Sequence, residues 1–219
     1  MNIKRFLQKT LPKSIYSFII RLGKVSLTIY ATSGIRNKNK NPVNSKKKIL
    51  IVKSDAIGDY IMFRNFIQIL KKSKKYRKYG IYLLGNESWR NIFEKLDKFE
   101  IDKSEFINRR YLYNKKYITE KLEKLNKEDF EIIIHPVCHR DFIIDYIIKK
   151  TNAKEKIGYA GKSMNQRGIE KKFTDKFYTK LIKTKEKLEF NRNKDFFEQI
   201  IGEKINLQNP KINIKKKTI

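Results

Sequence analysis

Apolar and polar positions along this chain follow two alternating patterns. Residues 48–53, KILIVK, form a short and largely apolar run, and apolar residues then recur at helical spacing over about 60–75. The same succession repeats almost to the end of the sequence. Further strands are predicted over 80–85, 105–109, 130–136 and 156–161, and further helices over 87–96, 113–127, 141–150 and 186–201. Nearly continuous apolar strands separated by helices predict a parallel sheet with helices on both faces, a Rossmann-like α/β fold.

The same pattern divides the chain into four parts. Residues 1–32 combine basic and apolar residues at helical spacing, with a break near Pro12, and predict a basic amphipathic helical extension. Residues 33–47 are polar and form a predicted linker, and residues 48–205 form the Rossmann-like domain. Residues 206–219 form a tail whose strand-like piece, PKINI, indicates the beginning of another unit.

The N-terminal extension has two interpretations. Residues 1–31 match a helix that lies on the anionic inner face of a membrane, with apolar residues in the interface and basic residues near lipid headgroups. The alternative is a helical extension that packs on the domain. The first interpretation places the protein in the cytoplasm, peripherally bound to the inner face of the cytoplasmic membrane. The single cysteine, Cys138, agrees with a reducing compartment.

The charge of the chain is strongly positive. Lys and Arg number 52 against 23 Asp and Glu, which gives a net charge of +29 and an attraction for polyanions. Lysine greatly outnumbers arginine, and Ile, Asn, Tyr and Phe are frequent, as an AT-rich genome would produce. Arginine recognises phosphates and bases better than lysine does, and no nucleic-acid-binding motif is present. We therefore expect no specific nucleic-acid partner, although a basic nucleic-acid-binding protein remains a rival hypothesis.

The loop after the first predicted strand, SDAIGD, is the main candidate for chemistry. Ligands of open parallel sheets bind beyond the carboxyl ends of the strands, where this loop lies. It lacks the glycine patterns of dinucleotide and P-loop sites. Asp59 falls at the predicted helix N-terminus, so it could cap the helix or accept a proton from a bound hydroxyl, and the two roles are compatible. Asp55 is interpreted as a loop-ordering or surface acid.

The stretch ILIVKSDAIGDYIMFRNFIQILKKS resembles the opening of glycosyltransferase family 9, the ADP-heptose:lipopolysaccharide heptosyltransferases and their relatives. In that family an apolar strand leads to R/K-x-[SD]-x-x-G-D and a helix. Segments 81–89, 129–161 and 188–202 agree with the family in order and spacing. The last segment carries the E-x-x-R-N signature as Glu189, Arg192 and Asn193. The resemblance covers about residues 48–205.

The resemblance implies the N-terminal half of a GT-B enzyme, which binds the acceptor. Asp59 matches the family's probable catalytic base, which deprotonates the acceptor hydroxyl for inverting attack on a nucleotide-activated sugar. The implied donor is ADP-heptose or a similar nucleotide sugar, held by the other domain, and the chemical step needs no metal. The implied acceptor is a phosphorylated glycolipid, part of lipopolysaccharide or a related cell-surface glycan. No cofactor-binding or metal-binding residue is assigned in this chain.

Seven further residues are predicted to bind the acceptor. Lys53, Ser54 and Gly58 match the family loop and are expected to shape the crevice. Four residues at the ends of later strands are expected to contact phosphate or hydroxyl groups of the acceptor: Arg109, Arg110, His139 and Arg140.

The family's C-terminal domain should begin near PKINI, where this sequence ends. We therefore expect the chain to be inactive alone, as a fragment, as one half of a split enzyme that needs a separate C-terminal half, or as a degenerate remnant. The alternative function is that of a non-catalytic protein that docks to a membrane or to a partner.

Overall fold

The structure is a computed structural model that describes residues 8, 10–34, 46–161, 164–166 and 168–211. Its centre is a six-stranded parallel sheet with the strand order β3-β2-β1-β4-β5-β6. The strands are β1 (Lys48–Lys53), β2 (Gly80–Asn86), β3 (Lys103–Ile107), β4 (Phe130–His135), β5 (Ala153–Tyr159) and β6 (Lys180–Ile182). The order reverses between β1 and β4, so the loops that follow these strands flank a crevice. The predicted Rossmann-like fold is confirmed.

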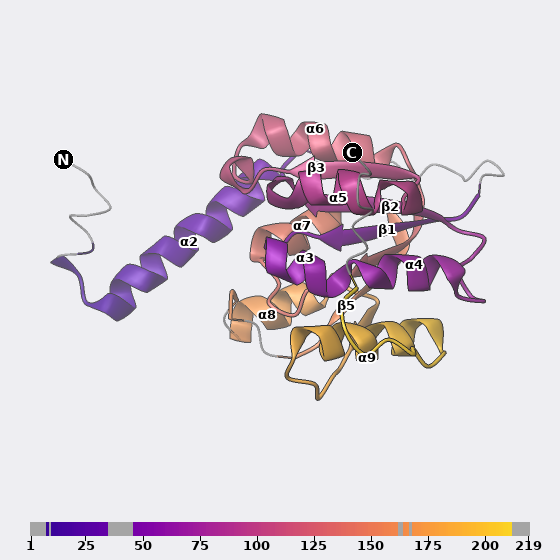
Figure 1. The fold of residues 1–219 in the computed structure, drawn as a ribbon. Helices are drawn as coiled ribbons and strands as arrows, with labels where there is room; N and C mark the ends of the chain where they lie inside the picture. The colour runs from indigo at the N-terminus through magenta and orange to yellow at the C-terminus, as the bar shows by residue number, and fades with distance from the viewer. Residues whose placement is uncertain (1–7, 9, 35–45, 162–163, 167, 212–219) are drawn as a thin grey trace, which may run out of the picture.

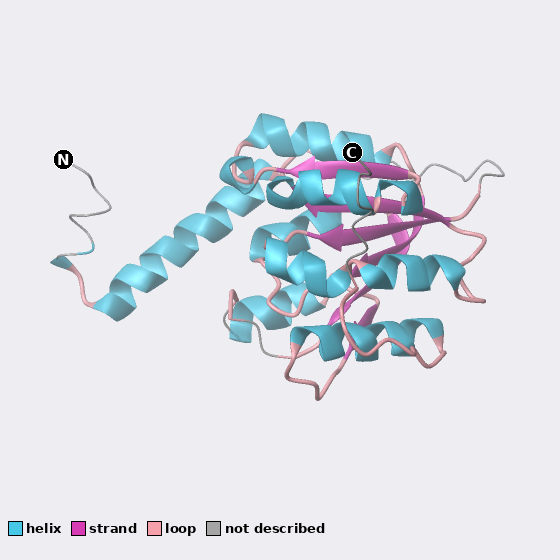
Figure 2. Ribbon diagram, in the orientation of Figure 1, coloured by secondary structure: helices cyan, strands magenta, loops and turns pink. Residues whose placement is uncertain are grey.

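Helices cover both faces of the sheet (Figures 1 and 2). One face carries α3 (Ile57–Phe63), α4 (Asn65–Lys72), α5 (Arg90–Leu96) and α9 (Glu189–Ile201). The other carries α6 (Lys115–Asn126) and α7 (Phe142–Lys150), and α8 (Gly168–Asp175) packs against α7. Short 3-10 turns span Glu87–Trp89, Lys98–Glu100 and Arg109–Tyr111.

The central strand β1 explains why both faces need a cover. Ile49 and Ile51 belong to the apolar cluster of the α3 and α9 face, whereas Leu50 and Val52 belong to the cluster of the α6 and α7 face. All four side chains are buried, because successive residues of a strand point to opposite faces. An apolar run of this kind is stable only between two layers of helices.

The structure also contains elements that the apolar pattern did not predict. Helix α8 and strand β6 are short, and β6 pairs with β5 at one edge of the sheet. The predicted helix over 60–75 begins earlier, at Ile57, and is divided into α3 and α4 at Arg64, whose dihedral angles are still helical. The predicted strand PKINI falls mainly on residues 212–219, outside the described residues.

The N-terminal extension contains helix α2 (Lys13–Ala31), which begins directly after Pro12. Its C-terminal part packs against α6 and α7, while its N-terminal part extends away from the domain (Figure 1). Only Thr28 and Ala31 of this helix are fully buried. Among the described residues, every helix is too short or too polar to cross a bilayer.

Candidate acceptor site

A cavity of about 430 Å³ lies at the carboxyl edge of the sheet, where the loops after β1 and β4 meet. This is the position at which open α/β sheets bind ligands. The residues that line it come from six separate segments: Ser54, Asp55, Ala56, Asp59, Asn86, Ser88, Arg109, Val137, Cys138, His139, Asp141, Met164, Asn165 and Glu189. The loop after the first strand, singled out in the sequence, therefore forms one wall of the cavity.

Lys53, the last residue of β1, is a fully buried cation beneath that wall. Its ammonium group donates to Asp55 Oδ2 at 2.8 Å and to the carbonyl oxygen of Pro136 at 3.2 Å. It also lies 3.7 Å from Glu189 Oε1 and 5.2 Å from the centre of the Phe63 ring. Lys53 does not line the cavity; it neutralises two of the carboxylates that do.

Asp55 is mostly buried, and its carboxyl group is coupled to the other charges of the cavity. Burial raises its pKa to about 6; the neighbouring Lys53 ammonium opposes this shift, and Asp59 and Glu189 add to it. Its Oδ1 atom is buried without a hydrogen-bond partner among the described residues. Asp55 is therefore more than a surface acid, because it holds a proton near pH 6 inside the cavity wall.

Asp59 occupies the third position of α3 and is partly exposed to the cavity. Its Oδ2 accepts a hydrogen bond of 3.2 Å from the backbone N–H of Ala56, which is the residue before the helix. This contact is the reaching-back half of a capping box, and the positive end of the helix dipole favours the carboxylate there. The structure thus shows both features that the sequence allowed, a capping contact and access to the cavity.

Glu189 begins α9 and completes the acidic wall. Its carboxylate pairs with Arg192 Nη2 at 2.6 Å and accepts a long hydrogen bond of 3.4 Å from Asn193 Nδ2. One oxygen each of Asp55, Asp59 and Glu189 lie within 4.8 Å of one another. Three carboxylates at this spacing could ligate a cation, but the Lys53 ammonium already contacts two of them. The sequence predicted no role for Glu189 beyond its place in the E-x-x-R-N signature.

Two residues at the end of β2 and in the 3-10 turn that follows it hold the Asp55 loop in place. Asn86 Nδ2 donates to the carbonyl oxygens of Ser54 at 3.2 Å and Asp55 at 3.0 Å. The indole N–H of Trp89 donates to the same Asp55 oxygen at 3.2 Å, and its ring stacks on Tyr60 at 4.0 Å. No local pattern in the sequence gave these two residues a role, although both lie in the segment 81–89 that carries part of the resemblance.

Arg109 and Ser54, two of the residues predicted to bind the acceptor, line the cavity. Arg109 Nη1 donates to the Ser54 carbonyl oxygen at 3.1 Å, and Nη2 pairs with Asp141 at 2.7 Å. Ser54 itself is buried, so it offers little surface to a ligand. Arg109 is the described cation of the cavity wall that remains accessible, and Asp141 already balances its charge.

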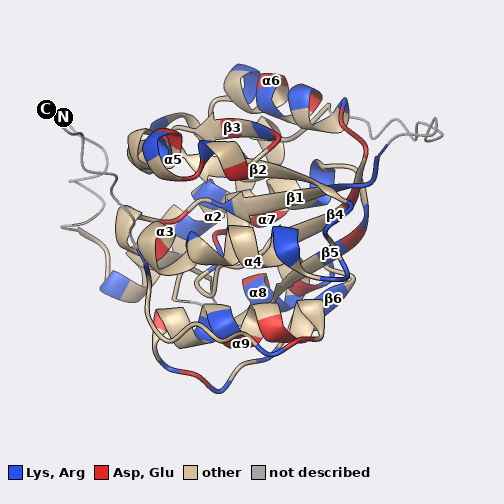
Figure 3. Cartoon of the chain, turned by 45° about the vertical axis from the view of Figure 1, so that its right-hand side comes forward, with Lys and Arg blue, Asp and Glu red and all other residues tan. Residues whose placement is uncertain are grey.

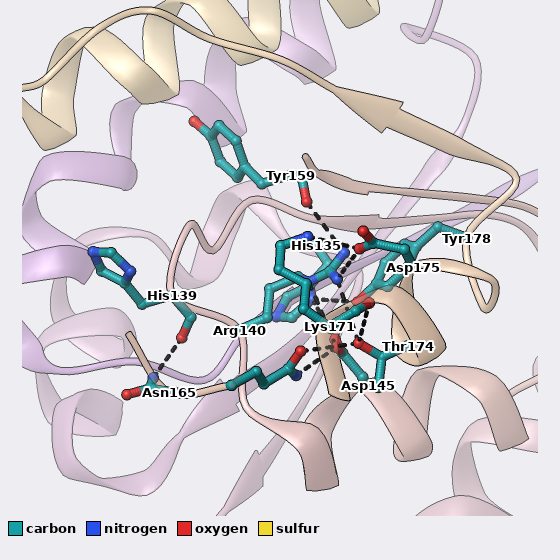
Figure 4. A network of polar contacts seen from close by, with 11 residues as sticks. His135, His139, Arg140, Asp145, Tyr159, Asn165, Lys171, Thr174, Asp175 and Tyr178 are labelled. Atoms are coloured by element: carbon teal, nitrogen blue, oxygen red, sulfur yellow. Dashed lines mark hydrogen bonds and ion pairs between the residues drawn. The ribbon is translucent and has the colours of Figure 1, made fainter. Parts of the chain in front are cut away.

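His139 also lines the cavity, at its outer side. Its Nδ1 accepts a hydrogen bond of 3.2 Å from the backbone N–H of Met164, and its carbonyl oxygen accepts one of 2.6 Å from Asn165. Figure 4 shows this imidazole apart from the buried network behind it. The neighbouring Cys138 is half-buried, and burial raises the pKa of its thiol. The placement agrees with the predicted contact between His139 and an acceptor.

The prediction that Arg140 contacts the acceptor is wrong. Its guanidinium is fully buried, donates to the Tyr159 carbonyl oxygen at 3.1 Å, and lies 3.5 Å from Asp145 Oδ2. It also pairs with Asp175 and stacks on the Tyr178 ring at 4.4 Å (Figure 4). Because α7 and α8 cover it, Arg140 anchors the loop that carries His139 instead of reaching the cavity.

Two other predicted acceptor residues lie outside the cavity wall. Arg110 is exposed in the 3-10 turn after β3, beyond the residues that line the cavity. Gly58 lies in the first turn of α3 with an ordinary helical backbone, and a Cβ atom added there would meet nothing within 4 Å. Gly58 therefore contributes no atom to the cavity lining.

The cavity is acidic although the chain is strongly basic. Among the described lining residues, four carboxylates, those of Asp55, Asp59, Asp141 and Glu189, face one guanidinium. Elsewhere basic and acidic segments alternate, as along α6 and α9 (Figure 3). The positive charge of the protein is thus not concentrated at the site.

Comparisons with known proteins agree with this architecture. No family model and no curated protein sequence matches the chain. Among solved structures, the E. coli heptosyltransferase WaaC with ADP-2-deoxy-2-fluoro heptose is similar, with a TM-score of 0.59 and 13% identity over 74% of this chain and 51% of that one. A glycosyl transferase family 9 protein from Veillonella parvula DSM 2008 gives a TM-score of 0.59 and 18% identity over 80% of this chain and 47% of that one.

The chain therefore spans about half the length of the solved structures that it matches. At these identities the likeness concerns the fold, and it agrees with the resemblance seen in the sequence. The described domain has the fold of glycosyltransferase family 9 proteins, over one Rossmann-like half of a GT-B architecture.

Proposed function

We propose that this chain is the acceptor-binding half of an inverting glycosyltransferase and that Asp59 is its catalytic base. The observation that carries the proposal is the Asp59 carboxylate, which is partly exposed in a cavity at the switch point of a glycosyltransferase-like fold. Asp59 is held in position by its place at the N-terminus of α3 and by the hydrogen bond that it accepts from the backbone N–H of Ala56, as a general base requires.

In the proposed reaction, Asp59 accepts the proton of an acceptor hydroxyl while that oxygen attacks the anomeric carbon of the donor. The bond between this carbon and the diphosphate oxygen breaks, and the nucleoside diphosphate leaves with the electron pair. A nucleotide sugar such as ADP-heptose would be held by a donor-binding half. That half would also stabilise the charge that develops on the leaving diphosphate.

The acidic wall constrains how the acceptor binds. The lining carboxylates of Asp55, Asp141 and Glu189 already engage the nearby cations Lys53, Arg109 and Arg192, so the described wall favours an uncharged, hydroxyl-rich sugar over a phosphate beside Asp59. The phosphates of a glycolipid acceptor would contact cations outside the cavity, such as Arg110, which is exposed next to Arg109. This proposal includes a lipopolysaccharide or related cell-surface glycan as acceptor and a peripheral position at the inner face of the cytoplasmic membrane.

The substitution Asp59→Asn tests the proposal in a protein that combines this chain with a donor-binding half. We expect the rate of sugar transfer to a phosphorylated core glycolipid to fall at least about a hundredfold, because general-base catalysis contributes about that much. Glu123→Gln, which changes an exposed acid of α6 in the same way, is the matched control and should keep the rate. Normal transfer by Asp59→Asn would reduce Asp59 to a capping residue and favour a non-catalytic docking protein.

A further inference from the structure

We propose that one face of α2 lies in the surface of an anionic membrane and holds the mouth of the cavity close to the lipid headgroups. The membrane contact stands on the structure of α2 alone. Its use, the presentation of a lipid-borne acceptor to Asp59, rests on the proposed function.

The face in question, called the apolar stripe, consists of Ile15, Phe18, Ile19, Leu22 and Ile29. These residues recur at intervals of three, four and seven, which places them on one side of a helix. Their side chains are 40–54% exposed, although apolar residues of this size are usually buried. A contiguous apolar face of this kind indicates an interaction surface.

The domain is bound by the other side of the helix. Thr28 and Ala31 are buried against it, and Val25 is partly buried. Arg21 pairs with Glu170 of α8 at 3.1 Å, so the helix is fixed to the domain in its middle as well as at its end. The apolar stripe consequently faces away from the protein, and its N-terminal part extends beyond it (Figure 1).

The charge of residues 1–31 indicates which kind of partner binds the apolar stripe. Residues 1–31 contain six basic residues, Lys4, Arg5, Lys9, Lys13, Arg21 and Lys24, and no Asp or Glu. Such a segment is attracted to anionic lipids, because the negative surface potential of the membrane attracts each cation near it. A second copy of this chain, with its net charge of +29, would instead be repelled. An apolar stripe in a purely basic segment therefore fits an anionic bilayer better than self-association.

The position of α2 also connects the membrane to the cavity. Arg21, Lys24 and Val25 line a small hollow together with Asp141 and Asn165, and these last two residues also line the cavity. A helix at the bilayer interface is buried only about 5–10 Å into the headgroup region. The cavity mouth would then lie beside the headgroups, where the sugar of a membrane-bound acceptor can enter.

Sedimentation with lipid vesicles tests the membrane contact with the full chain alone, without donor or acceptor. We expect binding to vesicles that contain phosphatidylglycerol, weaker binding to pure phosphatidylcholine, and release at high salt. The double variant Phe18→Ser, Leu22→Ser should lower the partition coefficient at least about tenfold, because it removes two large apolar side chains from the interface. The double variant Phe99→Ser, Leu188→Ser is the control, since it removes residues that are even more exposed but lie away from α2.

Equal vesicle binding by the two double variants would overturn the proposal. So would a wild-type dimer that the Phe18 and Leu22 variant converts to monomer, since the stripe would then be a contact between copies. Far-ultraviolet circular dichroism should show that both variants remain folded, because the changed side chains are exposed. Asp59→Asn should bind vesicles like the wild type, so a failure of the transferase hypothesis can be told apart from a failure of membrane docking.

Discussion

The carboxylates of Asp59 and Glu189 meet at the cavity although they come from opposite ends of the domain's sequence. Asp59 lies in the first turn of α3 and Glu189 in the first turn of α9, and oxygens of the two are within 4.8 Å. Both helices pack on the same face of the sheet and begin at the same edge, so both carboxylates lie at positive helix ends. This arrangement concentrates negative charge where the proposed proton transfer occurs. The buried ammonium group of Lys53 partly neutralises that charge.

The substitution Lys53→Met should strongly destabilise the fold. It leaves Asp55 and Glu189 without their buried cation, and breaking a buried ion pair from one side costs about 3–5 kcal/mol. Urea unfolding at pH 7 measures the loss. The double variant Lys53→Met, Glu189→Gln should recover part of it, because one unbalanced charge is removed. A loss below about 1 kcal/mol would mean that the ammonium group does not hold this wall together.

Asp55 should make stability depend on pH in an unusual direction. Its pKa is raised from 3.8 to about 6 in the folded protein. The folded state therefore keeps a proton that the unfolded state loses between about pH 4 and 6, and the stability from Asp55 declines as pH rises through 6. Relative to wild type, Asp55→Asn should gain at most about 3 kcal/mol between pH 4 and pH 7. Urea unfolding of both proteins at the two pH values gives this difference; a relative gain near zero would contradict the raised pKa.

The sequence predicted the sheet and the cavity wall because both depend on local patterns. An apolar strand such as residues 48–53 can be recognised in isolation, and the loop that follows it must lie at the carboxyl edge of a parallel sheet. Asp59 was identified for that reason. Glu189 could not be assigned a role, because its contact with Lys53 depends on how α9 packs against α3, which no local pattern specifies.

Arg140 shows the opposite limit. A basic residue after a strand usually faces solvent, and the sequence predicted such a position. The short helix α8 supplies Asp175, and α7 supplies Asp145, which together with the Tyr178 ring bury the guanidinium. Because α8 was not predicted, nothing in the sequence indicated that a helix would cover this side chain and that two carboxylates would contact it.

His135 should make the fold sensitive to acid. It is fully buried, and burial together with the nearby Arg140 and Lys53 holds its pKa well below 6.5. Tyr178 donates to Asp145 at 2.5 Å, so the His135 Nδ1–H, at 2.7 Å, is the group that donates to the Tyr178 oxygen. Below about pH 6.5 the unfolded state takes up a proton on this histidine and the folded state does not. The free energy of unfolding therefore decreases as the pH is lowered.

The variant His135→Gln isolates this contribution. Its side-chain amide can still donate to Tyr178, but it cannot be protonated. The difference in unfolding free energy between wild type and variant should change by up to about 1.4 kcal/mol per pH unit below pH 6.5, to the disadvantage of the wild type. A difference that stays constant from pH 7 to pH 5 would show that the histidine is not held neutral.

Two glycine substitutions compare a position packed against the cavity wall, Gly85, with a position in open space, Gly58. In Gly85→Ala the new Cβ would lie 2.3 Å from Trp89 Cη2, so the indole that holds the Asp55 loop must move. We expect destabilisation of about 1–3 kcal/mol, as for overpacked cores, and a shift in the fluorescence of Trp89, the single tryptophan. Gly58→Ala meets no atom within 4 Å and should stabilise α3 by up to about 1 kcal/mol. Thermal unfolding followed by tryptophan emission measures both; equal melting of the two variants would contradict the packing of Trp89 on Gly85.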